Sequence, residues 1–555
     1  MFATTPRGLR DVLPEEALWR EQIVQAVSGR FAEAGYLPVE TPMLEQADLL
    51  AASDAADQDT FRLFDSDGDL LMLRPEVTLP IARMVSTRLR DKEGPFRLRY
   101  AAPVFCESDP LRGESRQFTQ FGIELIGACG LDADAEVLLL MARALEAAGL
   151  SGYVISLGSV RPIDALLDAS GMDEAWCQRV RSLCHRCDLV GLGAQVDAAG
   201  LALAAPLRRA LKELPRVHGG REAIETARGL LDSCGCSDCG LDELAELLRR
   251  AEEARIGGRV SVDFSVMGAF GYYTGMVIEA YLPQFGIRLG SGGRYDKVFE
   301  RFGRPRPAAG FALSLDAVQT ALERQAASVP VRPLRIAVSK GSLFEGAIDL
   351  FKRAGLSVGD LEDPGRQLII RTDDVEYIIV RPTDAPAFVA FGGADCGICG
   401  RDSLIEAGLD VLELADLDYG ACRFVVAEPA DAAGRAEENY RRLGSMRVAT
   451  KYPRITRDYF NRIGIEVDVL KFHGNIELAP LVGMADRIVD ITATGTTLRE
   501  NNLAIVDEVL TCKARFFANP ASARTDSRVF DLARRLEAAA NDQRAEREAR
   551  QALGS

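Results

Sequence analysis

Histidine is scarce in this sequence of 555 residues, which contains only His185, His218 and His473. Chemistry that depends on several histidines is therefore not expected. No apolar run approaches the ~20 residues of a membrane span, and the N-terminal stretch MFATTPRGLRDVLPEE lacks the apolar core of a secretory signal. Basic residues are not in excess: the net charge is -16, which argues against a broad nucleic-acid surface but not against a phosphate ligand in a local pocket. We therefore expect a cytoplasmic protein with no membrane and no nucleic-acid partner.

Disulfides are also not expected, because the twelve cysteines of a cytosolic chain are mostly reduced thiols. Two clusters have spacings compatible with a four-thiolate zinc site; they contain Cys184, Cys187, Cys234, Cys236 and Cys239. Small buried thiols in a helical region explain the same pattern. We favour that interpretation and assign no metal ligands.

A chain of this length has room for three or four domains at about 100 to 200 residues each. The sequence changes character near residues 325–334, where a helical stretch ends in the proline-containing connector SVPVRP. An apolar strand then runs into a Lys-Gly-Ser turn and an amphipathic helix, as α/β domains usually begin. We therefore predict two parts, 1–330 and 331–555.

The two parts differ in their pattern of secondary structure. The second alternates predicted strands such as VEYIIVRP, CRFVVAEP, MRVATKYP and EVDVLKF with helices, which predicts two small α/β lobes. The first has a long helix around residues 18–34 and a mostly helical region at 130–255. Its extended stretches FRLRYAAPVF, QFTQFGIELIG and MVIEAYLP predict antiparallel strands.

Small hydroxyl residues surround one glycine in VDITATGTTLREN, residues 489–501, where a predicted strand passes into a helix. Backbone N–H groups and threonine hydroxyls in such a turn can hold a phosphate, which assigns that role to Thr494, Gly495, Thr496 and Thr497. Asp490 cannot bind phosphate, but it can accept hydrogen bonds from sugar hydroxyls. A sugar phosphate would suit both groups, whereas the alternative is an ordinary capped turn.

The surrounding sequence resembles ATP phosphoribosyltransferase. Five blocks carry the resemblance in order: AVSKGSL, EDPGRQL, the long block IIVRPTDAPAFVAFGGADCGICGRDSLIEAG, VATKYPRITRDYF, and KFHGNIELAPLVGMADRIVDITATGTTLRENNL. The resemblance implies a two-lobed α/β fold like that of periplasmic binding proteins. It also implies a reaction in which N1 of ATP attacks C1 of phosphoribosyl diphosphate and expels Mg²⁺-bound diphosphate, the first step of histidine biosynthesis.

The resemblance implies roles for individual residues. Asp490, Thr494, Gly495, Thr496 and Thr497 would bind phosphoribosyl diphosphate. Arg366, Glu477 and Lys340 would be catalytic, with Arg366 acting on the diphosphate. ATP would be bound by Lys340, Gly341, Arg381, Asp384 and Asp395, although Asp384 could instead cap the helix that follows it; Asp402 is a further, weaker candidate. Ser342 stands where many short-form enzymes have an arginine, so one cationic contact is absent there.

The first part resembles histidyl-tRNA synthetase in four ordered blocks: LRPEVTLPIAR, RLRYAAPVFCESDPLRGESRQFTQFGIELIG, GYYTG and LGSGGRYDKVF. The resemblance implies a class II synthetase-like antiparallel sheet with a helical insertion. Arginines of the synthetase are replaced by Cys106 and Gly268, and Ala317 lies near the place of a third. Because adenylate formation needs arginines to neutralise ATP phosphates, we expect no aminoacylation.

The segments that would surround histidine remain, and they contain Glu76, Gln120, Glu124, Tyr272 and Tyr273, with Arg74 a further candidate. This combination resembles the regulatory subunit that partners short-form ATP phosphoribosyltransferases, here fused to its catalytic partner. It implies inhibition by histidine and a homo-oligomer, because both related families assemble through dimers. Two alternatives are an active synthetase and a catalytically degenerate binding protein for histidine and nucleotides. The intact phosphate-binding motif at 494–497 opposes the second.

Overall fold

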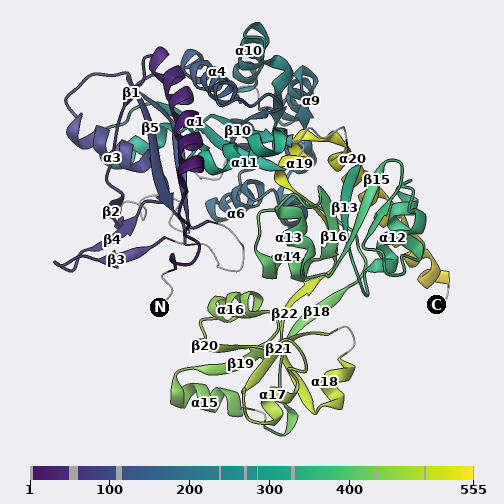
Figure 1. Cartoon of the computed structure of the whole chain (residues 1–555). Helices are drawn as coiled ribbons and strands as arrows, with labels where there is room; N and C mark the ends of the chain where they lie inside the picture. Colours follow the sequence, from purple (N-terminus) through teal and green to yellow (C-terminus); the bar gives the residue numbers. More distant parts are fainter. Residues whose placement is uncertain are drawn as a thin grey trace. The chain divides into compact units, whose positions relative to one another are not determined.

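The computed structural model of the chain describes residues 4–48, 60–107, 115–236, 239–267, 272–283, 286–326, 332–432, 434–492 and 495–553. The chain folds into two compact units, Met1–Val331 and Arg332–Ser555, which we call unit 1 and unit 2. Figure 1 shows the sheets and helices of each unit. Among the helices of the described residues, none has both the length and the apolar character that a membrane span requires.

A nine-stranded sheet forms the centre of unit 1, in the order β1-β5-β6-β12-β11-β10-β7-β9-β8. Its strands are β1 (Leu37–Pro38), β5 (Phe96–Phe105), β6 (Gln117–Ile126), β7 (Val154–Ser159), β8 (His218–Gly219), β9 (Val260–Asp263), β10 (Met276–Leu282), β11 (Ile287–Arg294) and β12 (Ala308–Ser314). The six central strands, from β5 to β7 in this order, pair antiparallel. The predicted antiparallel strands are therefore confirmed.

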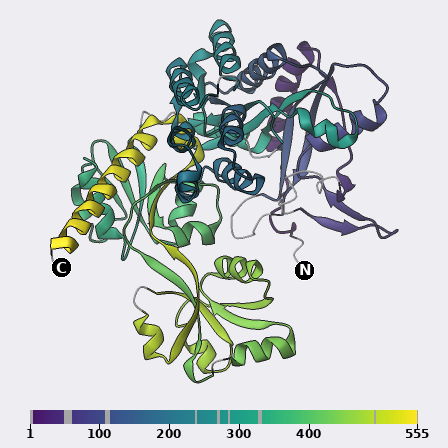
Figure 2. The ribbon, with the colours of Figure 1, turned by 180° about the vertical axis from the view of Figure 1, so that it is seen from behind.

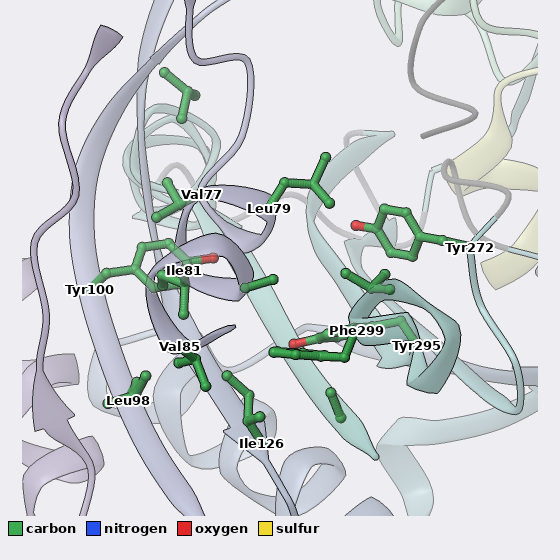
Figure 3. Packing of buried hydrophobic residues seen from close by; sticks show 14 of the residues in the cluster. Val77, Leu79, Ile81, Val85, Leu98, Tyr100, Ile126, Tyr272, Tyr295 and Phe299 are labelled. Carbon is green, nitrogen blue, oxygen red and sulfur yellow. The ribbon is translucent and has the colours of Figure 1, made fainter. Parts of the chain in front are cut away.

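The two faces of this sheet have different coverings. Phe311 on β12 points to the face covered by α1 (Pro14–Glu33), and its ring lies 5.8 Å from that of Phe31; α4 (Leu131–Ala147) and α11 (Leu315–Ala326) pack against the same sheet. Because side chains alternate along a strand, Tyr100 and Glu124 belong to the opposite face. There, α3 (Thr78–Arg88) packs on strand β5 through Ile81 and Val85 (Figure 3).

The region predicted as mostly helical, 130–255, contains α4 and six further α-helices among the described residues. They are α5 (Arg161–Ser170), α6 (Glu174–His185), α7 (Leu189–Ala198), α8 (Ala205–Glu213), α9 (Arg221–Asp232) and α10 (Leu241–Glu253). The prediction missed β7, whose buried residues pair with β10 in the central sheet. A separate three-stranded sheet consists of β2 (Leu44–Gln46), β3 (Arg62–Phe64) and β4 (Leu70–Leu73).

Unit 2 contains two sheets, and we call each sheet together with its helices a lobe, lobe 1 and lobe 2. Lobe 1 has the order β14-β15-β13-β16-β23-β17 and lobe 2 the order β20-β19-β21-β18-β22. The strands of lobe 1 are β13 (Leu334–Ser339), β14 (Ile369–Arg371), β15 (Val375–Val380), β16 (Cys396–Gly400), β17 (Leu412–Asp416) and β23 (Ala514–Ala518). Those of lobe 2 are β18 (Cys422–Pro429), β19 (Met446–Thr450), β20 (Val467–Lys471), β21 (Arg487–Thr492) and β22 (Leu503–Cys512).

The helices of unit 2 follow the strands in the alternation that the sequence predicts. Lobe 1 has α12 (Phe344–Arg353), α13 (Ala385–Ala390), α14 (Arg401–Ala407), α19 (Pro520–Thr525) and α20 (Ser527–Leu553), and lobe 2 has α15 (Arg435–Leu443), α16 (Pro453–Arg462), α17 (Leu478–Leu481) and α18 (Thr496–Glu500). The long helix α20 packs along α12 and β17 of lobe 1 (Figure 2).

Lobe 2 is a continuous insertion between β17 and β23 of lobe 1. The chain therefore passes between the lobes twice, through 417–421 on the way in and through Lys513 on the way out. In Figure 1, β18 and β22 lie side by side where they approach lobe 1. In both sheets the central strands are parallel. Their carboxyl ends share one edge of each sheet, which is where ligands of α/β proteins bind.

Candidate active site and buried carboxylate cluster

Asp490 lies near the carboxyl end of β21, and its carboxylate is 4.0 Å from the Lys451 ammonium, which follows β19. Burial raises the pKa of Asp490, Lys451 lowers it, and the nearby Glu477 carboxylate raises it. Glu477 follows β20, and its Oε2 atom is buried without a hydrogen-bond partner. Since buried polar atoms are nearly always paired, this oxygen is available as a hydrogen-bond acceptor.

Residues 494–497, which we call the threonine loop, follow Asp490 and the end of β21. Gly495 has a φ of 73° and caps α18 at its N-terminus, and its N–H donates to the Thr492 hydroxyl at 2.7 Å. An added Cβ would meet no atom closer than 3.7 Å, which is ordinary van der Waals contact. Thr496 and Thr497 are exposed at the start of α18, whereas Thr494 lies outside the described residues.

The carboxyl edge of lobe 1 holds most of the predicted ATP ligands. Lys340 and Gly341 follow β13, and Arg381 follows β15; all three are exposed. β14 runs antiparallel to β15, and Ile379 N donates to Leu368 O at 2.8 Å. The exposed Arg366 just before β14 therefore reaches the same edge. The cationic side chains Lys340, Arg366 and Arg381 therefore come from segments at the same edge of lobe 1.

Asp384 and Asp395 lie at opposite edges of lobe 1. Asp384 is the N-cap residue of α13, but its side chain caps no backbone N–H and accepts instead from the Thr383 hydroxyl at 3.2 Å. The alternative of a simple capping residue is therefore wrong, and Asp384 remains at the carboxyl edge beside Arg381.

Asp395 lies before β16, at the amino edge of lobe 1 and away from Lys340. Its carboxylate is buried and accepts hydrogen bonds from both Arg332 Nη atoms, Arg335 N and the Ser522 hydroxyl, each at 2.8–2.9 Å. This satisfied position argues against contact with ATP. Asp402, the weaker candidate, instead follows β16 at the carboxyl edge, where burial raises its pKa.

The two lobes contact each other beside these edges. The Glu406 carboxylate of α14 accepts the N–H groups of Arg454 and Ile455 at 3.1–3.2 Å, which caps α16 of the other lobe. Burial raises the pKa of Tyr452, and the charges of Asp402 and Asp490, among others, raise it further. The carboxyl edges of both lobes therefore lie close to this tyrosine.

In unit 1, two carboxylates are buried under the N-terminus of α3. Glu76 is 3% exposed and accepts from Thr78 N at 2.6 Å and Leu79 N at 2.8 Å. Glu124 is 1% exposed and accepts from the hydroxyls of Thr78, at 2.7 Å, and Tyr295. Neither forms an ion pair within 4.0 Å among the described residues, although the nearby Arg74 charge lowers the pKa of Glu76. We call Glu76, Glu124, Tyr100, Tyr272 and Tyr295 the carboxylate cluster.

The sheet below the cluster is lined by small residues. Gly122 pairs with Tyr100, and Gly310 pairs with Glu124; a Cβ at Gly310 would lie 2.4 Å from the Glu124 carboxylate. The Tyr273 ring lies over Gly293, 2.8 Å from where a Cβ would be. These glycines leave room above the sheet for the buried side chains.

One polar atom near the cluster, Oε1 of Gln120, is buried without a hydrogen-bond partner, whereas the Tyr100 hydroxyl interacts with Thr78 and Glu124. Gln120, Gly122 and Glu124 share one face of β6 because side chains alternate along a strand. Figure 3 shows the rings of Tyr100, Tyr272 and Tyr295 entering the cluster from different elements. An unpaired amide oxygen next to two buried carboxylates is typical of a site for a cationic, hydrogen-bonding ligand.

The cluster has unusual acid–base properties because water is excluded. Burial raises the pKa of Glu76 to about 7, although two backbone N–H groups oppose the shift. Burial also raises the pKa of Glu124 well above its usual value. By contrast, Arg74 donates to the carbonyls of Pro103 and Thr41 and to the Thr41 hydroxyl, so its contacts are structural.

The cysteines of the helical region contact backbone carbonyls. Cys187 Sγ lies 3.3 Å from Ser265 O, and Cys236 Sγ lies 3.5 Å from Ala165 O. In the parts of the chain that the structure describes, no three side chains of histidine, cysteine, aspartate or glutamate come together as metal ligands.

Comparison with known proteins accounts for both units. Residues 8–318 match the histidyl-tRNA synthetase family, and residues 381–538 match the ATP phosphoribosyltransferase family. An ATP phosphoribosyltransferase of Rubrobacter xylanophilus is 49% identical over 194 residues, which is 35% of this chain and 90% of that protein. An ATP phosphoribosyltransferase regulatory subunit of Moorella thermoacetica is 38% identical over 316 residues, 56% of this chain and 80% of that protein. The chain belongs to two families, the ATP phosphoribosyltransferases and their synthetase-like regulatory subunits.

The two families are joined in one polypeptide. In Moorella thermoacetica, a second protein, an ATP phosphoribosyltransferase, is 48% identical over 200 residues and covers 35% of this chain. A solved structure titled as an ATP phosphoribosyltransferase regulatory subunit/histidyl-tRNA synthetase from Bacillus halodurans is 31% identical with a TM-score of 0.54, covering 68% of this chain and 99% of its own. Unit 1 therefore has a class II synthetase-like fold, and the chain is an ATP phosphoribosyltransferase with a regulatory half.

Lys451 was assigned no role from the sequence, although the VATKYPRITRDYF block contains it. The signal available was its place directly after a predicted strand, where the carboxyl edges of parallel strands meet. Tyr295 and Thr78, both hydrogen-bonded to Glu124, were also missed, although they lie in the LGSGGRYDKVF and LRPEVTLPIAR blocks.

Proposed function

We propose that this chain joins N1 of ATP to C1 of phosphoribosyl diphosphate, giving N1-(5-phosphoribosyl)-ATP and diphosphate in the first step of histidine biosynthesis. The observation that carries the proposal is the group at the carboxyl edge of lobe 2. There, the unpaired Glu477 oxygen, Asp490 and Lys451 precede a glycine turn with positive φ at the start of α18. The identity of 48–49% to two ATP phosphoribosyltransferases supports the same reaction.

The residues of lobe 2 hold the ribosyl donor. Asp490 and Glu477 accept hydrogen bonds from the ribose hydroxyls. The N–H groups and hydroxyls at 494–497 bind the 5-phosphate. N1 of adenine already has a lone pair, so no residue needs to remove a proton from it. The carboxylates also stabilise the positive charge that develops on the ribosyl carbon as diphosphate leaves.

The residues of lobe 1 hold ATP. Lys340, Gly341, Arg381 and Asp384 share the carboxyl edge that parallel strands offer to ligands. Arg366 neutralises the departing diphosphate from the same edge. We also propose that the two lobes correspond to those of periplasmic binding proteins, because the chain crosses between them twice and Glu406 links them.

Mg²⁺ enters as a complex with the diphosphate of the substrate. The residues fit this arrangement, since Mg²⁺ usually takes one or two protein carboxylates and completes its shell with phosphate and water. Glu477, with its unpaired oxygen, and Asp490 are the carboxylates available. The ion would supply neutralisation of the leaving diphosphate.

We propose that the carboxylate cluster binds histidine and that histidine inhibits the enzyme from there. The ligand carries an ammonium group and an imidazole, which match two buried carboxylates, and Gln120 offers an unpaired polar atom. Tyr272 and Tyr273 provide the aromatic walls. Coupling to the active site requires that histidine bind one state of the enzyme more tightly.

Unit 1 is not expected to charge tRNA. Adenylate formation requires arginines around the ATP phosphates, and Cys106 and Ala317 stand near two of those places. Gly268, which replaces the third, lies outside the described residues.

We propose that the enzyme is a homo-oligomer. The three-stranded sheet of unit 1 and the segment before it expose the apolar side chains of Phe64, Met43, Leu44, Leu63 and Leu70, of which Phe64 is 71% exposed. Exposed apolar patches of this kind mark protein contacts. Light scattering tests the proposal, and a monomeric mass would contradict it.

A direct assay tests the proposed reaction. The full chain is mixed with ATP, phosphoribosyl diphosphate and Mg²⁺, and formation of phosphoribosyl-ATP is followed by its absorbance. Product that depends on all three is expected. Well-folded protein that forms no product would overturn the proposal and favour a degenerate binding protein, whereas charging of tRNA would favour a synthetase.

Replacing Lys451 with Met is expected to lower kcat/KM for phosphoribosyl diphosphate by about 10- to 100-fold. The change removes a cation beside Asp490 that offsets negative charge, and a lost charged contact is worth about 1.5–3 kcal/mol. Steady-state kinetics measures the effect. Lys352→Met is the control, because Lys352 lies on the surface of lobe 1 with Glu362; an equal loss in both variants would contradict the assignment.

Histidine binding is expected to release protons near pH 7. The empty cluster holds Glu76 partly protonated, because burial raises its pKa to about 7, and a cationic ligand favours the ionised carboxylate. As pH falls below 7, binding must first displace this proton, so the affinity decreases.

Calorimetry in buffers of different ionisation enthalpy measures the protons released. Glu76→Gln has no titrating group at this position and should release fewer. Equal release from the variant and the original chain would contradict a role for Glu76.

A further inference from the structure

The two crossings between the lobes bring a pair of cysteines together. Cys422 is the first residue of β18, which enters lobe 2, and Cys512 is the last residue of β22, which leaves it. The two residues are direct partners in the antiparallel pairing, and the register is regular from there to Phe424 and Leu510.

The position of this pair satisfies the geometry of a disulfide. Directly opposite residues of antiparallel strands point to the same face with their α-carbons about 4.5–5.5 Å apart, within the range of about 4.4–6.8 Å that a disulfide spans. Both side chains contact the same core cluster of lobe 2, Cys512 fully buried and Cys422 partly exposed. By contrast, Cys396 and Cys399 are three residues apart on β16 and point to opposite faces of the sheet.

We propose that Cys422 and Cys512 form a reversible disulfide that fastens together the two chain segments connecting lobes 1 and 2. The oxidant is a low-molecular-weight disulfide such as oxidised glutathione. The Cys422 thiolate attacks one glutathione sulfur and expels a glutathione thiolate. Cys512 then loses its proton and attacks the Cys422 sulfur, expelling the second. Two cysteine thiols are oxidised, and one glutathione disulfide is reduced to two thiols.

The surroundings support this order of attack. The Cys512 thiol donates a hydrogen bond to Cys422, which lowers the pKa of Cys422 and raises that of Cys512. Cys422 is also the accessible member of the pair. Cysteine pairs that oxidise in a reducing compartment are usually regulatory, and thiolate character with access selects the sulfur that reacts first.

The disulfide would act on the candidate active site. The charges of Asp402, Asp490 and Cys422 all raise the pKa of Tyr452, so the pair lies near the carboxyl edges of both lobes. A bond between the two connecting segments restricts movement of one lobe relative to the other. This consequence, unlike the disulfide itself, rests on the proposed function.

Peptide mapping of the full chain tests the bond. The protein is equilibrated with oxidised glutathione, alkylated, digested without reduction and analysed by mass spectrometry. A linked pair of peptides containing Cys422 and Cys512 is expected, with dithiothreitol restoring both thiols. Cys399→Ser should still form the link and Cys422→Ser should not. Free alkylation of both cysteines, a persistent glutathione adduct on Cys422, or a link to another cysteine would overturn the proposal.

The activity of the same samples tests the consequence. Formation of phosphoribosyl-ATP by the oxidised enzyme is expected to fall by about tenfold or more, because lobe closure completes such sites, and dithiothreitol should restore it. Oxidant should not change the rate of Cys422→Ser. Unchanged activity of the linked enzyme would overturn control by the disulfide. A reduced enzyme that never forms product would count against the proposed reaction, leaving the mapped bond unaffected.

Discussion

Glu124→Gln is expected to lower the affinity for histidine by about 10- to 100-fold. The substitution keeps the size of the side chain and removes a carboxyl group that burial favours in its neutral form and that a bound ammonium group would favour in its ionised form. A hydrogen bond to a charged group contributes about 1.5–3 kcal/mol, and the effect is strong where water is excluded. Calorimetric titration measures the affinity, and inhibition of phosphoribosyl-ATP formation should shift to higher histidine concentration in parallel.

Glu136→Gln provides the matched control for this prediction. Glu136 lies on α4 and pairs with Arg97 of β5, and that arginine points to the helix-covered face of the same sheet. The control also loses a carboxylate in a polar contact, but away from the cluster. If both variants bind histidine as tightly as the original chain, the regulatory site lies elsewhere.

Gly495→Val is expected to raise KM for phosphoribosyl diphosphate by at least about tenfold. The glycine has a φ of 73°, so a branched side chain would strain the turn, and it would also crowd the loop proposed to hold the phosphate. A strained backbone conformation costs about 1–3 kcal/mol, and lost anion contacts add to this. Steady-state kinetics measures the effect.

Gly464→Val separates strain from lost binding. Gly464 has a φ of 72° in the same lobe, and an added Cβ would meet no atom within 4 Å. Both variants carry a similar backbone penalty, visible in thermal unfolding, but only Gly495 lies in the threonine loop. A similar rise in KM for both would show that the turn acts through stability rather than through the phosphate.

The pattern of strands and helices was largely predictable because the alternation of apolar and polar residues along the sequence indicates it directly. FRLRYAAPVF and QFTQFGIELIG pair along their whole length as β5 and β6. MRVATKYP and EVDVLKF form the parallel pair β19 and β20 with α16 between them. β7 was missed because its residues VISLGS sit within a long helical region, and strand pairing depends on partners far along the chain.

The candidate site was predictable only where a residue's place along its own strand was clear. Asp490 and Gly495 lie at the end of β21, as the strand-to-helix pattern indicates. Asp395 was misjudged because the sequence shows an aspartate beside a strand but not its partners Arg332 and Ser522, which come from distant segments. Lys451 was missed because its approach to Asp490 depends on the pairing of β19 with β21.

The insertion of lobe 2 into lobe 1 also has a consequence for synthesis on the ribosome. β17 pairs with β23 alone, and β23 also pairs with β16. β17 therefore lacks its partner, and β16 lacks one of its two partners, until the ninety-odd residues of lobe 2 have been translated. A nascent chain stopped before Ala514 would present unpaired strand edges, which favour aggregation. Release of a soluble lobe 1 thus depends on translation continuing through β23.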